Sequence, residues 1–557
     1  MIITSIYELL TSGTVPVVTA KLFLGLIVLL FLITLVRVSS RSTRHGGVLP
    51  GVPELRGVPI LGALPMYLRK GIPHVIGRMI EIGGDGGIAY ANVVSSVLVS
   101  VHEPALVKEV LGFPDEIASR EGDTSTGMSW SPFWTLRRMI GNLSLFNYVG
   151  PETRHQRSVF IREFNSTKSN REKFPTIARL AKQHCAGLLP QKSGMVADIR
   201  LAADNFAISL WGDVLYANPS NHLDDNGKVR TLSNTIMHLA GDPWPAIWYY
   251  LQQAILGLLS PGEPTKSESL LRKDIESVIG RNMSRLMQWE SGPNREMKTL
   301  RSLSVQTGGS PTGPLSKFAT EFANLNLFGG HHSIGLNVVW AIIELGRHPD
   351  KMRRLLDEID AVTPQDLDKE EDGEQVKGWT LDWTRVTNDM PYLDAVLTEV
   401  NRLYPTVHAT LRVMNKDAIL KGTSHHTGKN PGKREELPTT ISRTEPVILR
   451  KGMIVYMSYW HLHTAKKYWG EDNKEFIPER FLPDEQGDKK RPVGPLMSFG
   501  YGPRSCVGYK FASIAAKVYL VTLLKMYKVE VQGTEHGMKL GTLLEPGNPV
   551  AVALTTR

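Results

Sequence analysis

The sequence predicts a protein built mainly from α-helices. Three stretches carry apolar residues at helical spacing, namely residues 315–345, 392–404 and 507–524. Division of 557 residues by a typical domain length suggests three or four domains. However, residues that are expected to surround one site are spread from 157 to 508, so we expect one large domain instead.

One of the two cysteines, Cys506, lies in a glycine-rich run from Phe499 to Gly508. Gly500 and Gly502 have no side chains, so this backbone can turn tightly and lie close to a bulky ligand. Apolar residues recur at helical spacing directly after the cysteine, which predicts a helix that begins at Cys506. The positive end of a helix dipole favours an anion, so we expect the pKa of this thiol to be lowered.

Arg504 adds a permanent cation near the sulfur, suited to a carboxylate. A thiolate ligand and a cation for a propionate are what an iron porphyrin requires. The alternative is that Cys506 is a buried structural thiol, since free cysteine is often buried. Zinc is disfavoured, because Cys185 and Cys506 are far apart and have no partners at zinc-ligand spacing.

The run resembles the haem-binding signature F-x-x-G-x-R-x-C-x-G of the cytochrome P-450 (haem-thiolate monooxygenase) family. It matches at every fixed position: Phe499, Gly502, Arg504, Cys506 and Gly508. The resemblance covers nearly the whole chain after its amino-terminal segment. It implies a mainly α fold with small β-sheets (α+β), and a haem b (iron protoporphyrin IX) with Cys506 as the axial thiolate.

A second motif supports the resemblance. Glu399 and Arg402 are three residues apart on a helical pattern that Pro405 ends, so they share one helix face and can pair. An exposed pair of this kind contributes little by itself. It matches the E-x-x-R of the family, and residues 476–481 match the P-E-R-F segment. The resemblance implies a structural charge triad of Glu399, Arg402 and Arg480.

Two further arginines resemble residues that contact the haem propionates in the family. Arg157 matches the arginine of helix C, although Thr153 stands where the family has tryptophan, so one propionate contact is missing from the pattern. Arg412 resembles a strand arginine that contacts the other propionate. With Arg504 they form a predicted basic cradle. The alternative for each is a solvated surface arginine.

Residues 328–334, within the helical pattern 315–345, resemble the oxygen-binding part of helix I, [A/G]-G-x-[D/E]-T. Gly329 and Gly330 in a helix interior cost about 2 kcal/mol together, which favours a local opening of the helix. His332 stands where the family has an acid, and Ser333 where it has threonine.

Cleavage of dioxygen requires protons, and in the family the acid and alcohol organise their delivery. Histidine can pass protons and serine can donate a hydrogen bond, so we interpret His332 and Ser333 as a rewired catalytic relay. Neighbouring helical residues point about 100° apart, so His331 is expected to pack against another element. Two alternatives remain: a site that rearranges peroxides without proton delivery, and a histidine that ligates iron and blocks oxygen.

The amino terminus predicts a membrane anchor. We divide the chain into a short luminal segment (1–14), a transmembrane helix (15–36), a basic and proline-rich hinge (37–66) and a haem-binding catalytic domain (67–557). Lys21 can reach the near interface, and the arginines that follow residue 36 predict a cytosolic body at the endoplasmic reticulum. The alternative is a cleaved signal peptide.

Composition agrees with this placement. Two cysteines provide no disulfide framework, and a net charge of +9 suits an anionic membrane surface and an acidic redox partner. No basic motif with interleaved aromatic residues indicates nucleic acid. The chain resembles no flavin or iron–sulfur module, so the resemblance implies a separate NADPH-cytochrome reductase as electron donor. Residues 421–444 are predicted to form an inserted surface loop.

The sequence says less about the substrate. Aromatic and aliphatic residues at 244–259 fall where the family has its F and G helices, and residues 119–148 correspond to the B–C region that lines substrate pockets. The predicted substrate is an apolar small molecule such as a terpenoid, steroid or polyketide, and a weaker similarity points to fungal enzymes of secondary metabolism. The predicted reaction is monooxygenation. The alternatives are a haem-thiolate isomerase or dehydratase that acts on a peroxide, and a non-catalytic haem-binding protein.

Overall fold

A computed structural model describes the chain in several ranges. These are residues 49–59, 61–93, 96–120, 151–188, 196–216, 273, 277, 299–310, 315–316, 319–320, 322, 329–363, 365–366, 370–371, 374–375, 378–421, 446–483, 494–533 and 536–557.

Helices account for most of the regular structure. The longer helices in the described ranges are α3 (Leu64–Gly83), α4 (Pro104–Gly112), α7 (Pro151–Asn165), α8 (Thr167–Ala186), α9 (Ile199–Tyr216), α13 (Thr299–Gln306), α15 (His331–Arg347), α16 (Pro349–Val362), α18 (Pro391–Leu403) and α21 (Tyr509–Met526). The shorter ones are α17 (Trp383–Asn388), α19 (Tyr459–His463), α20 (Lys466–Trp469) and the 3₁₀ turns η1 (Gly84–Gly86), η3 (Pro478–Phe481) and η4 (Gly502–Arg504).

The strands form small sheets. The largest has the order β1-β2-β12-β9-β3, built from β1 (Ile88–Val93), β2 (Ser96–Val101), β12 (Ile454–Ser458), β9 (Ala409–Met414) and β3 (Ala118–Ser119). A second has the order β13-β16-β4, built from β13 (Tyr527–Val531), β16 (Ala551–Thr556) and β4 (Val196–Asp198). The remaining two-stranded pairs are β10 (Ala418–Leu420) with β11 (Val447–Leu449), β14 (Met538–Leu540) with β15 (Leu544–Pro546), β5 (Gln365–Asp366) with β8 (Gly378–Trp379), and β6 (Glu370–Glu371) with β7 (Glu374–Gln375). The prediction of a mainly α fold with small β-sheets is confirmed.

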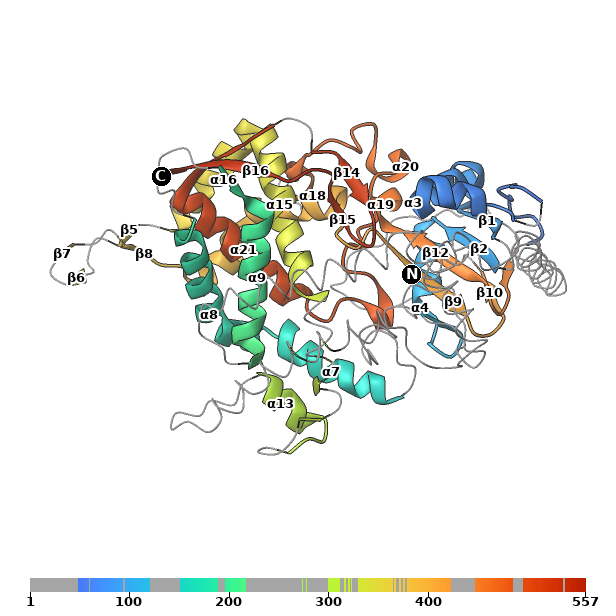
Figure 1. Cartoon of the computed structure of the whole chain (residues 1–557), viewed down its shortest axis with the longest axis horizontal. Helices are drawn as coiled ribbons and strands as arrows, with labels where there is room; N and C mark the ends of the chain where they lie inside the picture. Colours follow the sequence, from blue (N-terminus) through green and yellow to red (C-terminus); the bar gives the residue numbers. More distant parts are fainter. Residues whose placement is uncertain are drawn as a thin grey trace, which may run out of the picture.

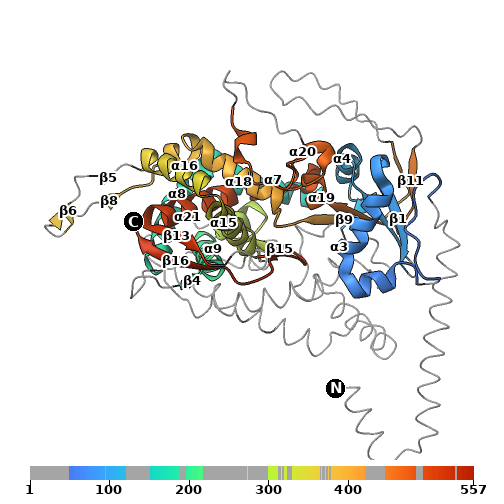
Figure 2. The ribbon, with the colours of Figure 1, turned by 90° about the horizontal axis from the view of Figure 1, so that it is seen from above.

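Helices and the main sheet occupy different sides of the molecule. Figures 1 and 2 show α8, α9, α15, α16 and α21 grouped on one side, and the five-stranded sheet with α3 on the other. Helices α18 and α19 lie between these groups in both views. Segments distant in sequence therefore meet where the helical side joins the sheet.

Helix α15 forms the centre of the helical side. Its residues from Ile334 to Leu345 are buried except for Asn337, and the apolar side chains among them belong to one core cluster with residues of α9, α18 and α21. A helix that is apolar on nearly all sides is stable only when other helices surround it. This explains why a sequence with so few polar positions forms α15 in the middle of the molecule.

Several predicted boundaries can be compared with the structure. Helix α18 ends at Leu403, two positions before Pro405, as predicted. Leu315 and Ser316 lie outside any helix, so the predicted start of the long helix at 315 was too early. In the described part of the predicted hinge, Leu49, Val52 and Leu55 are buried.

The predicted membrane anchor at 15–36 lies outside the described residues and stays a prediction. Among the helices of the described ranges, none is both long enough and apolar enough to cross a bilayer. The segment 244–259, residues 121–148 and nearly all of the predicted insertion 421–444 also lie outside the described residues.

Candidate functional site

The loop that carries Cys506 turns tightly at two glycines. Gly500 has φ 74° and Gly502 has φ 69°, a left-handed conformation that glycine adopts readily and other residues rarely. At Gly502 a side chain is excluded for a second reason, because an added Cβ would lie 2.9 Å from the carbonyl oxygen of Leu111. The backbone N–H of Cys506 donates to the carbonyl oxygen of Phe499 at 2.8 Å. The loop is thus closed on itself and held against α4.

The predicted helix start at Cys506 was wrong. Helix α21 begins at Tyr509, and Gly508 is its N-cap. The reason is local: the N–H of Cys506 is bonded back to Phe499 and so belongs to the loop. Two other residues of the predicted signature lie in open surroundings. A Cβ added at Gly508 would meet no atom within 4 Å. Phe499 is among the exposed large apolar residues of the described chain.

The thiol of Cys506 is accessible to solvent. Desolvation by the surrounding protein nevertheless raises its pKa, and this outweighs the backbone N–H of Gly508 and the charges of Arg157 and Arg120, which lower it. The predicted lowering of this pKa was therefore wrong. A sulfur that contacts solvent and is also desolvated by nearby protein lies in a recess.

The three arginines predicted to form a cradle come together from α7, β9 and the cysteine loop. Arg157 donates through Nη2 to the carbonyl oxygen of Ser505 at 2.5 Å, next to Cys506. Burial and, to a smaller extent, the charge of Arg504 lower the pKa of Arg157 to about 10. Burial and Arg504 also lower the pKa of Arg412, which is 2% exposed. Arg504 is thus close enough to Arg157 and to Arg412 to repel both.

A fourth arginine, Arg120, joins this group and was missed in the sequence. Burial lowers its pKa well below the usual value, and the charges of Arg412, Arg504 and Arg157 add to that effect. Its position follows from strand pairing: Ser119 of β3 lies opposite Val413 of β9, and continuing this register places Arg120 beside Arg412. A two-residue strand has too little periodicity to be recognised from sequence.

Asp115 supplies negative charge to the arginine cluster, defined here as Arg120, Arg157, Arg412 and Arg504. It accepts from Arg504 through two bonds, one of them 3.1 Å from Nε. A paired fork of this kind fixes the plane of the guanidinium. Among the described residues, one carboxylate thus lies beside four cations, so the cluster keeps an excess of positive charge, which suits an anionic ligand with carboxylate groups.

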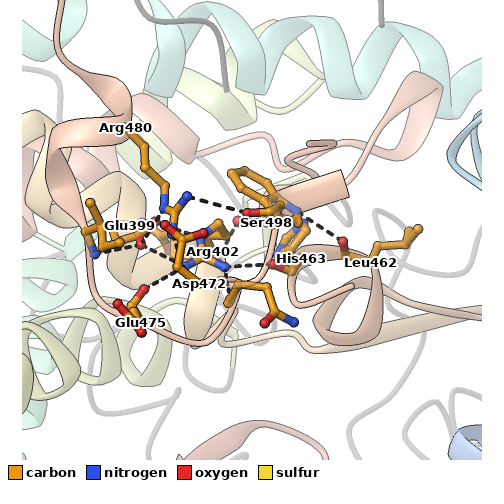
Figure 3. A network of polar contacts seen from close by, with 12 residues as sticks. Glu399, Arg402, Leu462, His463, Asp472, Glu475, Arg480 and Ser498 are labelled. Atoms are coloured by element: carbon orange, nitrogen blue, oxygen red, sulfur yellow. Dashed lines mark hydrogen bonds and ion pairs between the residues drawn. The ribbon is translucent and has the colours of Figure 1, made fainter. Parts of the chain in front are cut away.

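The predicted triad is assembled around a fully buried ion pair. Arg402 donates to Glu399 through Nε at 2.6 Å and through Nη2 at 2.7 Å, and neither side chain is exposed. Arg480 lies with its Nε 3.6 Å from Glu399 Oε1 and donates to the backbone and side chain of Asp472, each at 2.8 Å (Figure 3). Arg402 also donates to the carbonyl oxygens of three residues: His463 at 2.9 Å, Asn473 at 2.6 Å and Glu475 at 3.0 Å.

Two bonds join this network to the cysteine loop. The N–H of Met497 donates to Nε2 of His463 at 2.8 Å, and Oγ of Ser498 donates to the carbonyl oxygen of Asn401 at 2.8 Å. His463 and Ser498 lie beside Arg402 in Figure 3. Burial lowers the pKa of His463 to about 3, so it is neutral and can accept from Met497. The residues just before Gly500 are therefore tied to α18 and α19.

The structure places His332 and Ser333 in the first turn of α15. Gly330 lies in a turn and α15 begins at His331, so the helix pattern is interrupted at the predicted glycines. Ser333 Oγ donates to the carbonyl oxygen of Gly330 at 3.4 Å. Both histidines are buried, and their ring centroids lie 4.1 Å apart.

A neighbouring helix contacts His332, whereas we expected this contact for His331. Nδ1 of His332 lies 3.1 Å from Nη2 of Arg200 and 3.4 Å from Oδ2 of Asp204, both on α9. Neither partner could be recognised from the sequence, because no short motif joins α9 to α15.

Comparison with known proteins agrees with this geometry. The family model described as Cytochrome P450 matches residues 50–430 and 439–552, which is most of the chain. The chain belongs to the cytochrome P450 family. This confirms the resemblance stated from the cysteine loop and its companion motifs.

Curated relatives of this P450 include fungal and mammalian proteins. Cytochrome P450 monooxygenase claW of Ampulloclitocybe clavipes is 30% identical over 37% of this chain and 35% of its own length. Cytochrome P450 3A13 of Mus musculus is 32% identical, and lithocholate 6-beta-hydroxylase of Mesocricetus auratus 28% identical, each over 42% of this chain and 39% of the relative. The similarity thus spans well under half the length of these relatives.

The cofactor of the P450 family is iron protoporphyrin IX with an axial cysteine thiolate, and the prediction of this cofactor is confirmed. The residues of this chain fit it. A recessed, accessible thiol at Cys506 lies near the positively charged arginine cluster. A haem has an iron that the thiol can bind and two carboxylates that the arginine cluster can bind. The side chain of Thr153, at the position of the family's tryptophan, lies outside the described residues.

Proposed function

We propose that this P450 is a monooxygenase that inserts one oxygen atom from dioxygen into an apolar small molecule. The observation that carries the proposal is the recessed thiol of Cys506 beside the arginine cluster. The family and the names of the relatives support the reaction class. When bound, the haem supplies the chemistry that activates dioxygen and transfers one oxygen atom.

Each site residue has a distinct proposed role. Cys506 is the axial ligand, and the backbone N–H of Gly508 donates toward its sulfur. Arg157, Arg412 and Arg504, together with Arg120, hold the two carboxylates of the cofactor.

Three further residues support the cysteine loop from behind. Glu399, Arg402 and Arg480 act structurally, because their bonds reach the segment that leads to Cys506.

His332 and Ser333 are the proposed proton relay. His332 carries a ring nitrogen that can bind or release a proton, and Ser333 carries a hydroxyl in the same helical turn. His332→Ala is expected to raise the release of hydrogen peroxide at the expense of product, because protons then arrive too slowly. Unchanged coupling of NADPH to product would remove His332 from this role.

The proposal extends to the substrate and to the location of the enzyme. The substrate is a terpenoid, steroid or polyketide-like molecule in secondary metabolism. One relative, lithocholate 6-beta-hydroxylase, is named for a steroid substrate, which supports an apolar ring-containing molecule. Electrons come from a separate NADPH-cytochrome reductase. The catalytic domain, residues 67–557, lies on the cytosolic side of the endoplasmic reticulum membrane, anchored by residues 15–36.

A spectrum and a turnover assay test the proposal. Reduced protein treated with carbon monoxide is expected to absorb near 450 nm, and Cys506→Ser is expected to abolish that band. A band that survives the substitution would exclude Cys506 as ligand. In microsomes with reductase and NADPH, a screen of candidate substrates is expected to yield products heavier by one oxygen atom.

The peroxide isomerase remains the second candidate, because His332 replaces the acid of the family and its Nδ1 is engaged by α9. Turnover of a peroxide substrate without NADPH or reductase would favour it over the monooxygenase. Substrate-dependent consumption of oxygen would exclude a non-catalytic haem carrier.

A further inference from the structure

The contact between α9 and α15 is a buried, charged cluster formed by His332, Asp204 and Arg200. Arg200 and Asp204 lie one helical turn apart on α9, with Arg200 Nε donating to Asp204 Oδ2 at 2.8 Å. Both approach Nδ1 of His332, Arg200 Nη2 at 3.1 Å and Asp204 Oδ2 at 3.4 Å. The side chains of His332 and Asp204 are 2% and 3% exposed.

A glycine on α15 makes room for the carboxylate. A Cβ added at Gly335 would overlap Oδ1 of Asp204, so any larger residue there would push α9 and α15 apart. The same Oδ1 is buried and makes no hydrogen bond to any described residue. Asp204 is therefore inserted between two tightly packed helices. Burial of a carboxylate with one oxygen left without a hydrogen bond costs free energy of folding, so stability alone does not account for this residue.

Charge keeps this carboxylate ionised. Burial by itself would raise the pKa of Asp204, but the hydrogen bond from His332 and the charges of Arg200, His332 and His331 outweigh it and lower the pKa. Arg200 is 19% exposed and its Nη1 lies 4.0 Å from Oε2 of Glu545 on β15. The cluster thus reaches from the start of α15 toward the surface.

The two partners act differently on the imidazole. The carboxylate of Asp204 accepts from Nδ1–H and stabilises the imidazolium, whereas Arg200 can only donate to an unprotonated Nδ1. With Nδ1 held by Asp204, the other nitrogen can lose its proton and regain one without movement of the ring. Nε2 of His332 is buried and has no hydrogen-bond partner among the described residues.

We propose that Asp204 is a positioning residue that holds His332 through Nδ1–H and leaves Nε2 as the atom that gives and takes the proton, and that Arg200 in turn holds the carboxylate of Asp204. The imidazolium releases the proton of Nε2 toward the side of the site where dioxygen binds. It becomes the neutral Nδ1–H form, which still donates its hydrogen bond to Asp204. A proton from solvent then returns to Nε2, so each cycle transfers one proton and changes no bond to carbon. The inference rests on the proposed monooxygenase function.

The first test measures coupling in the full-length holoenzyme with reductase. Asp204→Asn keeps the shape of the side chain but removes its charge. It is expected to lower product formation about tenfold, the size of the activity loss when a histidine loses its supporting carboxylate, and to raise the hydrogen peroxide released per NADPH. Asp213→Asn is the matched control, because Asp213 is a buried carboxylate on the same helix, paired with Arg179 of α8. The control is expected to leave the peroxide yield unchanged.

The second test measures the energetic coupling between the side chains of Asp204 and His332, and it does not depend on turnover. The melting temperature is determined for wild type, Asp204→Asn, His332→Ala and the double variant. If the two side chains act as one unit, the double variant melts well above the value expected from adding the two single shifts. Additive shifts would overturn the proposal, and so would an unchanged peroxide yield in Asp204→Asn.

Failure of the proposed function is recognised separately. A wild-type protein that shows no band near 450 nm, or that turns over without NADPH, contradicts the monooxygenase itself, whatever the melting temperatures show. If Asp204→Asn does not fold, the peroxide released per NADPH is measured in Arg200→Lys instead. Lysine keeps the charge but loses the planar fork of donors, so the peroxide yield is again expected to rise. Normal coupling in Arg200→Lys would then overturn the inference.

Discussion

Arg402 and Arg412 are both buried, but their surroundings differ. Arg402 has no exposed surface, and a carboxylate and three backbone carbonyls satisfy it from within the protein. Arg412 is 2% exposed, donates to the carbonyl oxygen of its neighbour Leu411 at 2.9 Å, and is repelled by Arg120 and Arg504. Burial alone therefore does not distinguish a structural arginine from a ligand-binding one.

The two arginines differ in whether the protein itself supplies the charge that neutralises them. At Arg402 the protein supplies the negative charge, so the cost of desolvation is offset whether or not a ligand is bound. In the arginine cluster the like charges remain close together, and an anionic ligand would relieve their repulsion. Loss of Arg402 or its partner should thus affect folding, whereas loss of Arg412 should affect the cofactor.

The largest effect is expected from Glu399→Gln. This change leaves the guanidinium of Arg402 buried without its counter-charge, which costs about 3–5 kcal/mol. The free energy of unfolding in urea is the measurement, and the holoenzyme yield should fall with it.

Glu479→Gln is the matched control for this prediction. Glu479 also forms ion pairs, with Lys351 at 3.1 Å and Arg354 at 3.4 Å, but its side chain is 31% exposed. A partly exposed pair contributes about 0–1 kcal/mol. Equal losses in the two variants would show that burial of the triad is not what makes it important.

A smaller effect, on the cofactor rather than the fold, is expected from Arg412→Gln. Loss of one charged hydrogen bond to a haem carboxylate costs about 1.5–3 kcal/mol, or roughly ten- to a hundredfold in haem affinity. Haem transfer to an excess of apomyoglobin measures it. The urea midpoint of the haem-free protein should stay the same or rise, because repulsion from Arg120 and Arg504 is removed.

If Arg412→Gln instead destabilises the haem-free protein and leaves haem transfer unchanged, the contrast between the two arginines is wrong. Arg412 would then be a structural residue like Arg402.

The smallest expected effect is on the pH dependence of stability. It arises at the hydrogen bond between Met497 and His463, which joins the triad network to the cysteine loop. The pKa of His463 is lowered to about 3 in the folded protein, against about 6.5 in an unfolded chain. Between these values the unfolded state binds a proton that the folded state does not, so stability is full above pH 6.5 and declines as pH falls toward 3. The loss from this residue is about 1.4 kcal/mol at pH 5.5.

His463→Asn tests this sign. Asparagine can accept from the N–H of Met497 but does not titrate, so the decline of unfolding free energy from pH 7.5 to 5.5 should be shallower by about that amount. A decline as steep as in the wild type would mean that His463 does not contribute to acid sensitivity.

Residues in local motifs were predictable. Cys506 with its loop, and Glu399 with Arg402, lie in short motifs whose spacing already fixes their geometry. The errors arose where energy depends on distant atoms. The thiol pKa was predicted from the helix dipole, but the helix begins three positions later, at Tyr509, and desolvation by the whole recess dominates.

The sequence by itself determined the family, the cofactor and the residues of the cysteine loop and the E-x-x-R pair, because each depends on chemistry within a few neighbouring residues. Only the tertiary structure decided that Arg120 joins the arginine cluster and that Asp204 and Arg200 lie beside His332. These contacts join strands and helices more than a hundred residues apart. Their energy depends on burial and on the summed charge of several segments, which no local pattern records.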